Sequence, residues 1–430
     1  MKILIQNGRV IDPASGLDQT ADVAIAAGHI VAMGQAPQDF KPNKVIDAQG
    51  CIVAPGLVDL AARLREPGQE HEGMLASELA AAVAGGVTCL VCSPDTDPVL
   101  DEPGLVEMLR YRAAKLHQSR VLPLGALTVG LEGEVLTEMG QLTAAGCVGF
   151  SQAEVALPNT QVVQRALQYA SSFGYTVWLR PQDFYLGQGV AASGPLATRM
   201  GLSSVSVAAE TIALHTIFEL VRSTRARVHL CRISSAAGVA LVRQAKVEGL
   251  PVTADVSINS LHLTDADMGY FDSRARLTPV LRQQPDRDAL RAGLVDGTLD
   301  ALVSDHTPVD TDAKDLPFAE AEPGATGLEL LWSLALKWGQ AEGLDVSAVV
   351  SRITSHPARV LGSTLRDLQG SVGQLRVGGV ADVCVLSTEG HWPVTAQALR
   401  SQGKSTPFSG YELPGRVLAT VVAGHVAFEV

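Results

Sequence analysis

Apolar runs rich in β-branched residues recur through the middle of the chain, separated by segments of helical periodicity. These runs begin at residues 57, 86, 121, 146, 175, 227, 251 and 299. Continuous apolar runs are typical of parallel strands that are buried on both faces. Between them, residues 74–86 and 159–174 carry apolar side chains at helical spacing. Strands that alternate with helices in this way predict an α/β fold closed into a (β/α)8 TIM-like barrel.

The two ends of the chain have a different pattern, typical of β-hairpins. It covers residues 21–34 and 44–56 before the predicted barrel, and residues 379–387 and 417–430 after it. Each end has too few strands to bury a hydrophobic face by itself. We therefore expect the ends to join in one composite β-domain, made of residues 1–54 and 372–430, beside a barrel of residues 55–371.

Length and composition fit this folded, two-part chain. Its 430 residues suit a large barrel with an appended domain, and 47% of them are hydrophobic while 18% are charged. No apolar run reaches the roughly 18–20 residues that a membrane helix needs. The first twelve residues alternate like a strand and do not resemble a signal peptide. We expect a cytoplasmic protein that does not enter a membrane.

Net charge and cysteine content argue against two further classes, nucleic-acid-binding proteins and disulfide-stabilised proteins. The net charge of −12, without a basic stripe, argues against a nucleic-acid partner. The six cysteines are scattered, which fits reduced thiols better than a disulfide framework. Cys89 and Cys92 lie in one predicted strand, where positions three apart face opposite sides and do not share a metal or a disulfide.

The carboxyl ends of the predicted strands carry an unusual set of side chains. Reactive groups of a (β/α)8 barrel project from these ends. Along the chain, the residues found there are Asp59, Ala61, Arg63, Arg65, Arg180, Arg232 and Asp305. Alternation along the first strand puts its four residues on one face. The sequence therefore predicts a cationic barrel mouth in which the face of the first strand contains one carboxylate, Asp59.

Several stretches resemble dihydroorotase, a member of the metal-dependent amidohydrolases. They are PGLVDLAARLREPGQEHEGM, GGVTCLVCSPDTDPV, FSQ, RPQD, HLCRISS, TPVLR, SDHTPVD, EPGATGLE and the closing STPFSGYELPGRVLATVVAGHV. The resemblance runs through nearly the whole chain and implies a barrel of the amidohydrolase type. Active members hydrolyse the cyclic amide of dihydroorotate, or close it from carbamoyl aspartate, with zinc held by histidines and an aspartate.

The resemblance also shows which metal ligands have changed. The family's four histidine ligands fall on Ala61, Arg63, Arg180 and Arg232. The ligand of the fourth strand falls near Gln152 and Ala153, and only Asp305 matches its catalytic counterpart. Alanine has no donor atom and guanidinium has no lone pair to give a metal. We therefore expect no zinc, no other cofactor and no hydrolysis.

A buried Asp305 without a metal would be an uncompensated charge. We hypothesise that Arg63, Arg180 or Arg232 pairs with it, so that a guanidinium replaces the positive charge of the metal. The alternative is that these arginines are unrelated to Asp305 and point into solvent in an open mouth.

The resemblance implies a damaged substrate pocket as well. Arg65 matches the arginine that grips the substrate carboxylate in active relatives. Asp95 replaces an asparagine and would repel that carboxylate, while Asn259 and Thr278 replace a histidine and an asparagine. We expect dihydroorotate to bind poorly. Of the remaining histidines, we expect His229 to be packed in the core, His306 to be structural and His262 to be exposed.

The residues and the resemblance leave three alternative functions for this chain. The first is a catalytically silent dihydroorotase homologue in pyrimidine biosynthesis, part of an oligomer with the aspartate transcarbamoylase catalytic chain, because inactive bacterial homologues of this family support that enzyme. The second is an active dihydroorotase or another cyclic amidohydrolase with a non-standard metal site. The third is a binding module that uses Arg65 and the other arginines for an anionic pyrimidine intermediate.

Overall fold

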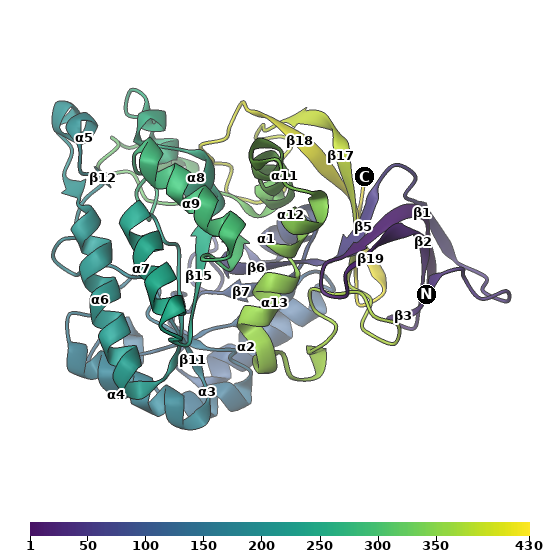
Figure 1. Ribbon diagram of the computed structural model, residues 1–430, viewed down its shortest axis with the longest axis horizontal. Coiled ribbons are helices and arrows are strands. Elements are labelled where there is room, and N and C mark those ends of the chain that lie inside the picture. Colours follow the sequence, from purple (N-terminus) through teal and green to yellow (C-terminus); the bar gives the residue numbers. More distant parts are fainter.

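The computed structural model describes all of residues 1–430, and its centre is a closed parallel barrel (Figure 1). Each predicted strand is present, the third being split in two. The strands are β6 (Leu57–Ala62), β7 (Val87–Cys92), β8 (Arg120–Pro123) with β9 (Gly125–Ala126), β10 (Phe150–Ser151), β11 (Thr176–Leu179), β14 (Arg227–Leu230), β15 (Val252–Ser257) and β16 (Ala301–Val303). Neighbouring strands pair in parallel in this order. The barrel closes where His306, just after β16, bridges Ala62 of β6.

Helices surround the barrel, and the two predicted from periodicity are α1 (Leu75–Ala84) and α4 (Thr160–Phe173). The Asn159 side chain accepts a hydrogen bond from the backbone N–H of Gln161 at the start of α4, and Gly174 ends it with a φ of 71°. The other helices are α2 (Pro103–Lys115), α3 (Met139–Ala145), α5 (Pro195–Met200), α6 (Val207–Thr224), α7 (Ala236–Val247), α8 (Ile258–His262), α9 (Gln284–Asp296), α10 (Thr311–Lys314), α11 (Leu331–Glu342), α12 (Val346–Ser351) and α13 (Ser355–Leu361).

The two ends of the chain form one sheet beside the barrel. Its strands are β1 (Lys2–Asp12), β2 (Leu17–Ala26), β3 (His29–Gly34), β4 (Lys44–Asp47), β5 (Ile52–Pro55), β17 (Val383–Pro393), β18 (Glu412–Val422) and β19 (His425–Glu429). The strand order is β19-β18-β17-β5-β1-β2-β3, and β4 pairs with β1. The N-terminal and C-terminal parts meet where β5 pairs antiparallel with β17. The predicted fold class, a barrel with a composite β-domain, is confirmed.

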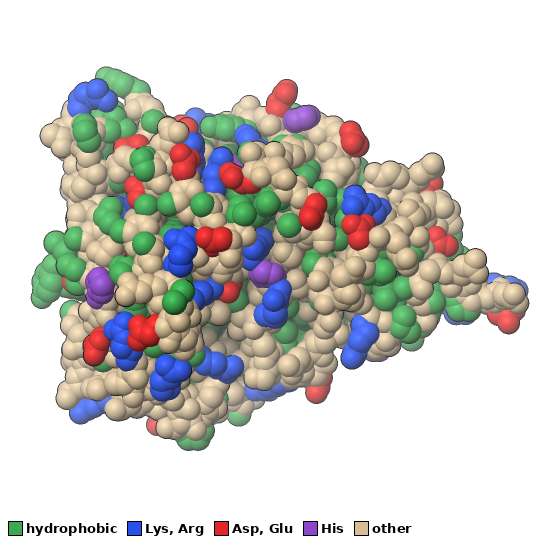
Figure 2. Space-filling view, in the orientation of Figure 1, with side chains coloured by type: hydrophobic (Ala, Val, Ile, Leu, Met, Phe, Trp, Pro, Cys, Tyr) green, Lys and Arg blue, Asp and Glu red, His purple; other side chains and the backbone are tan.

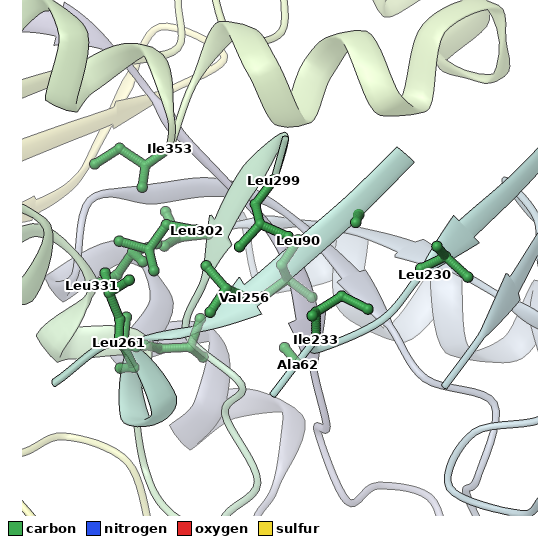
Figure 3. Close-up of a cluster of buried hydrophobic side chains, with 14 of the residues drawn as sticks. Ala62, Leu90, Leu230, Ile233, Val256, Leu261, Leu299, Leu302, Leu331 and Ile353 are labelled. Carbon is green, nitrogen blue, oxygen red and sulfur yellow. The ribbon is translucent and has the colours of Figure 1, made fainter. Parts of the chain in front are cut away.

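Alternation along the barrel strands separates two layers of apolar side chains. Leu90, Val256 and Leu302 point outward with Ala62 and pack toward the helices (Figure 3). A second cluster, which includes Val58, Val91 and Val303, fills the barrel interior. Cys89 belongs to the interior cluster and Cys92 to the outer one, so the two thiols face opposite sides, as predicted.

The remaining short strands, β12 (Ala191–Ala192) and β13 (Ser204–Val205), pair in a loop region. No helix has both the length and the apolar character needed to cross a membrane. On the face drawn in Figure 2, basic and acidic side chains are interspersed.

Candidate functional site

A cavity of about 200 Å³ lies at the carboxyl ends of the barrel strands. Its lining is polar and comes from the loops that follow several strands. All four positions expected in the substrate pocket line it together with the retained aspartate; they are Arg65, Asp95, Asn259, Thr278 and Asp305. The fold therefore brings these residues, which are far apart in the sequence, to one place.

Three arginines converge at this end of the barrel on one carboxylate, that of Glu154. Its Oε1 lies 2.9 Å from Nη2 of Arg63 and 2.5 Å from Nη2 of Arg232. Its Oε2 lies 3.0 Å from Nη1 of Arg180. The arginine side chains are only 10%, 6% and 11% exposed, respectively. The alternative that these arginines point into solvent is therefore wrong.

The predicted pairing of an arginine with Asp305 is confirmed, and the arginine is Arg232. Nη1 of Arg232 donates a hydrogen bond of 3.1 Å to Oδ1 of Asp305, and both side chains are 6% exposed. Arg63 instead donates from Nε to Oδ2 of Asp95 at 2.8 Å. The three arginines and the three carboxylates Asp95, Glu154 and Asp305 form what we call the arginine–carboxylate cluster.

The ionisation of this cluster follows from its burial and its charges. Burial by itself would raise the pKa of Glu154, but the attraction of Arg232, Arg180 and Arg63 outweighs burial and lowers that pKa to about 2. Asp95 is likewise subject to burial, and Arg63 lowers its pKa below the usual value. Burial raises the pKa of Asp305, and Arg232 opposes that increase. With all members ionised, the three cations balance the three anions.

Among the carboxylates of the mouth, Glu154 is the group that sequence reasoning missed. The fourth-strand position near Gln152 and Ala153 does not supply a side chain to the cluster. The side chain of Gln152 donates to the carbonyl of Leu131 at 2.7 Å and accepts from Thr128. Ala153 has a φ of 51°, which turns the chain before Glu154. The signal in the sequence that could have identified Glu154 was its place as an acidic residue shortly after the end of the fourth strand.

Asp59 does not lie in the mouth, although alternation along the first strand placed it there. The register of β6 shifts between Asp59 and Ala62, so alternation does not hold along this strand. The carboxylate is fully buried and accepts hydrogen bonds from the backbone N–H of Ser304, at 2.9 Å, and from its hydroxyl. Burial raises the pKa of Asp59 to about 6. Ala61 packs against the barrel interior.

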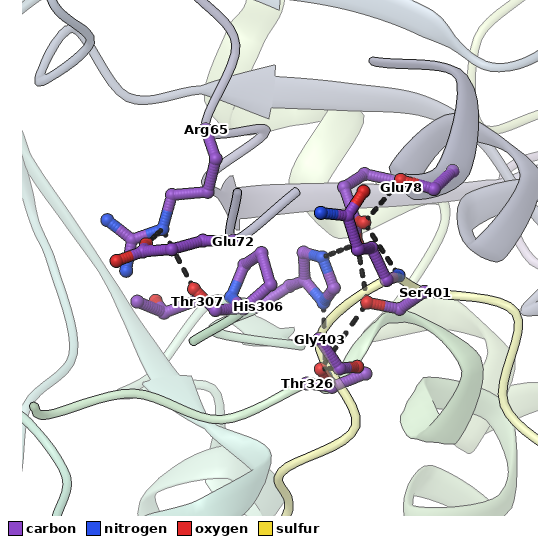
Figure 4. A network of polar contacts seen from close by, with 12 residues as sticks. Arg65, Glu72, Glu78, His306, Thr307, Thr326, Ser401 and Gly403 are labelled. Carbon is purple, nitrogen blue, oxygen red and sulfur yellow. Dashed lines mark hydrogen bonds and ion pairs between the residues drawn. The ribbon is translucent and has the colours of Figure 1, made fainter. Parts of the chain in front are cut away.

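Arg65 forms ion pairs and hydrogen bonds with other groups of the protein (Figure 4). Its Nε lies 2.6 Å from Glu72 and donates to the carbonyl of Pro308 at 2.8 Å. Its Nη1 donates to Gln69 at 2.9 Å, and its Nη2 lies 3.2 Å from Glu322. Burial raises the pKa of Glu72 to about 7, against the opposing effect of Arg65. Arg65 can therefore bind a ligand carboxylate only if it releases some of these partners.

His306 has a structural role, as predicted. The backbone N–H of Gly327 donates to its Nδ1 at 3.2 Å, which leaves the Nε2 proton for Glu78 at 2.8 Å. Glu78 also accepts from the hydroxyl of Ser401 at 2.6 Å (Figure 4). This buried network ties the end of β16 to α1 and to the C-terminal segment. His262, expected to be exposed, instead lies on α8 and contacts the carbonyl of Leu334 at 2.9 Å.

One group of potential metal ligands lies inside the barrel. Ligand atoms of His229, Cys231 and Asp255 are within 4.8 Å of one another. Both imidazole nitrogens of His229 are engaged, with Thr253 at 2.8 Å and Asp255 at 2.9 Å. Burial raises the pKa of the Cys231 thiol well above its ordinary value, which opposes the thiolate that a metal needs. His229 is fully buried, so its predicted place in the core is confirmed.

Backbone strain gathers at the strand ends. Arg65, Ala153, Arg232 and Asp305 have φ values of 62°, 51°, 56° and 51°. Left-handed conformations are rare for residues with a Cβ and often mark functional sites in enzymes. Four positions with left-handed backbone conformations therefore lie at the strand ends that carry the arginines and Asp305.

Comparison with solved structures defines the class of fold. The L-hydantoinase (dihydropyrimidinase) of Arthrobacter aurescens has a TM-score of 0.87, with 24% identity over 99% of this chain and 96% of that one. The D-hydantoinase of Thermus sp. has a TM-score of 0.82, with 20% identity over 99% of this chain and 95% of that one. The molecule is therefore an amidohydrolase-type barrel with a β-domain built from both termini.

Sequence comparison identifies the family. Residues 50–237 match the model of the dihydro-orotase-like family. The chain is 42% identical over 430 residues to a dihydroorotase-like protein of Pseudomonas aeruginosa, covering 100% of both chains. It is 38% identical over 430 residues to a dihydroorotase of Geobacter sp. (strain M21), again covering 100% of both. The chain belongs to the dihydroorotase-like family.

Proposed function

We propose that this chain is a catalytically silent member of its family that serves as a structural subunit in pyrimidine biosynthesis. The observation that carries the proposal is the arginine–carboxylate cluster at the barrel mouth. Glu154 is held by three buried arginines, and Asp305 is held by one of them. By the resemblance to dihydroorotase, these fixed cations stand at positions where hydrolytic members have metal ligands.

The residues of the mouth do not fit a hydrolytic zinc site. Guanidinium groups carry permanent positive charge and offer no lone pair, so Arg63, Arg180 and Arg232 repel a cation instead of ligating it. A catalytic zinc needs three protein ligands and an open position for water. The carboxylates Glu154 and Asp305 are already committed to these arginines. Hydrolysis of a cyclic amide at neutral pH therefore lacks an activated water.

The same geometry gives little support to a binding module for an anionic pyrimidine. An anion entering the cavity would meet the carboxylates of Asp95, Glu154 and Asp305, which line it. Arg65, the expected anchor, is held by Glu72 and Glu322. Binding would have to break these ion pairs within a cavity of about 200 Å³.

We propose the aspartate transcarbamoylase catalytic chain as the partner, because the resemblance includes inactive members that support that enzyme. The surface offers a place for contact. Val155, Tyr185 and Ile212 are 45%, 77% and 45% exposed, and they line one shallow pocket of about 150 Å³ with Phe184. Exposed apolar patches often mark protein contacts. The six free thiols fit a reducing compartment such as the cytoplasm.

The test is to mix the purified chain with the aspartate transcarbamoylase catalytic chain of the same organism and to measure mass by light scattering after size exclusion. We expect one stable complex of both chains. Tyr185→Asp is expected to weaken the complex, whereas Tyr270→Asp, which changes a 95% exposed tyrosine outside that pocket, is the matched control. Separate elution of the two chains at micromolar concentration would contradict the proposal.

A further inference from the structure

A cavity of about 500 Å³ lies at the opposite end of the barrel from the mouth. Its walls include Arg120 and Val121 at the amino end of β8, and Val148, which precedes β10. The kinked 3₁₀-helical segment Gly362–Leu368 and the turn between β18 and β19 complete the walls. Ligand pockets for small molecules commonly have volumes of this order.

The charges around this cavity are predominantly positive. Five basic residues line it against a single acid, Asp367; they are Arg110, His117, Arg120, Arg366 and His425. Arg120 is paired with Asp382. Arg110 and Arg366 form no ion pair and donate to the backbone carbonyls of Ala145 and Thr143. Arg110 and Arg366 thus bring two guanidinium groups without a carboxylate partner to one cavity.

Polar atoms without partners lie in the same wall. Ser119 is 2% exposed, and its buried Oγ has no hydrogen-bond partner. The buried Oε1 of Gln118 has none either, and both residues line the cavity. Buried polar groups are nearly always hydrogen-bonded, so this orphaned hydroxyl beside the cavity lacks a partner that the protein does not supply. Apolar side chains, among them Val121, Val148 and Leu365, make up another part of the lining.

We propose that this cavity binds a phosphorylated small molecule that also carries an apolar or ring portion, as a nucleoside phosphate does. Guanidinium groups bind phosphate oxygens through paired N–H donors, which suits Arg110 and Arg366. The Ser119 hydroxyl bonds the same ligand. The apolar side chains pack against the ring. The site is independent of the barrel mouth and of the proposed role as a subunit.

Calorimetric titration of the full chain tests the proposal with three probes: adenosine diphosphate, pyrophosphate and adenosine. We expect adenosine diphosphate to bind with a Kd below about 1 mM, pyrophosphate to bind more weakly and adenosine to bind weakest of all. Absence of heat with both adenosine diphosphate and pyrophosphate at about 5 mM would overturn the proposal. Equal affinity for adenosine and adenosine diphosphate would overturn the phosphate assignment.

Variants place the ligand in the cavity. Combined Arg110→Gln and Arg366→Gln are expected to weaken adenosine diphosphate binding by about tenfold or more. Arg243→Gln, which removes an exposed arginine paired with Asp296 on the barrel surface, is the matched control and should leave binding unchanged. Unaltered binding by the double variant would overturn the site.

Ser119→Ala gives a second test that does not depend on a charge change. Because Oγ of Ser119 has no partner in the protein, its removal breaks no internal hydrogen bond and should not lower the Tm. Binding of adenosine diphosphate should nevertheless weaken several-fold. A variant with unchanged affinity would overturn the role of this hydroxyl in the site.

Discussion

Replacing Glu154 by glutamine should destabilise the protein, because the change leaves three buried arginines around an uncharged group. The pKa of Glu154 is lowered from its usual 4.5 to about 2. This lowering of the pKa corresponds to roughly 3 kcal/mol of stability. Removal of one partner from a buried ion pair typically costs about 3–5 kcal/mol. The side chain is 28% exposed, which favours the lower figure of about 3 kcal/mol.

The pH dependence has a definite sign. Because the pKa of Glu154 is lower in the folded state, its stabilisation is fully present above pH 4.5 and is lost as the pH falls through about 2. The difference between wild type and Glu154→Gln should therefore be constant near pH 7 and shrink below pH 4.5.

Urea unfolding followed by tryptophan fluorescence at pH 7 measures the effect. With a slope of about 3 kcal/mol per M, we expect the midpoint to fall by about 1 M. Glu219→Gln, which affects a surface pair with Arg222, is the matched control and should change stability by less than about 1 kcal/mol.

A double-mutant cycle isolates the interaction energy between Glu154 and Arg180. Glu154 is the only ion-pair partner of Arg180, so Arg180→Met should reduce the cost of Glu154→Gln. A cost below about 0.5 kcal/mol, or full additivity of the two changes, would refute the reasoning.

Three further predictions concern the buried charges around the mouth. Burial raises the pKa of Asp59 to about 6, so ionisation of this carboxyl group destabilises the fold as the pH rises through 6. The stability of Asp59→Asn, measured by urea unfolding, should therefore increase relative to that of the wild type between pH 4 and pH 7. Arg65→Met should lower the Tm by several degrees because it leaves the buried carboxylate of Glu72 without its ion-pair partner. Adding Glu72→Gln should recover part of this loss of stability, and no recovery would contradict the pairing of Arg65 with Glu72. His306→Phe should destabilise by about 2–4 kcal/mol through the loss of its bond to Glu78, without changing the metal content measured by mass spectrometry.

The fold could be predicted from the sequence because burial sets the pattern of the strands. A strand covered on both faces must be apolar throughout, and the runs that begin at residues 57, 227 and 299 became β6, β14 and β16. The pairing of Arg232 with Asp305 could be anticipated in the same way, since a buried carboxylate without a metal requires a cation.

What the sequence did not reveal depends on loop geometry and on long-range partners. Glu154 reaches the mouth because Ala153 turns the chain with a positive φ, which no periodicity encodes. Arg65 has one partner, Glu72, in the same loop and another, Glu322, more than 250 residues away. The motif identified Arg65 as a position that binds a carboxylate in active relatives, but it did not show which groups of the protein pair with Arg65. The motif therefore could not show whether Arg65 is free to bind a ligand.

If, as we propose, the arginine–carboxylate cluster stands in place of a catalytic metal, the chain does not hydrolyse dihydroorotate. The most direct measurement is dihydroorotate turnover by the purified chain after incubation with zinc, with the dihydroorotase of Geobacter sp. (strain M21) as the positive control. We expect no turnover above the protein-free rate. A rate that rises in proportion to the amount of this chain, requires zinc and is abolished by a chelator would contradict the claim.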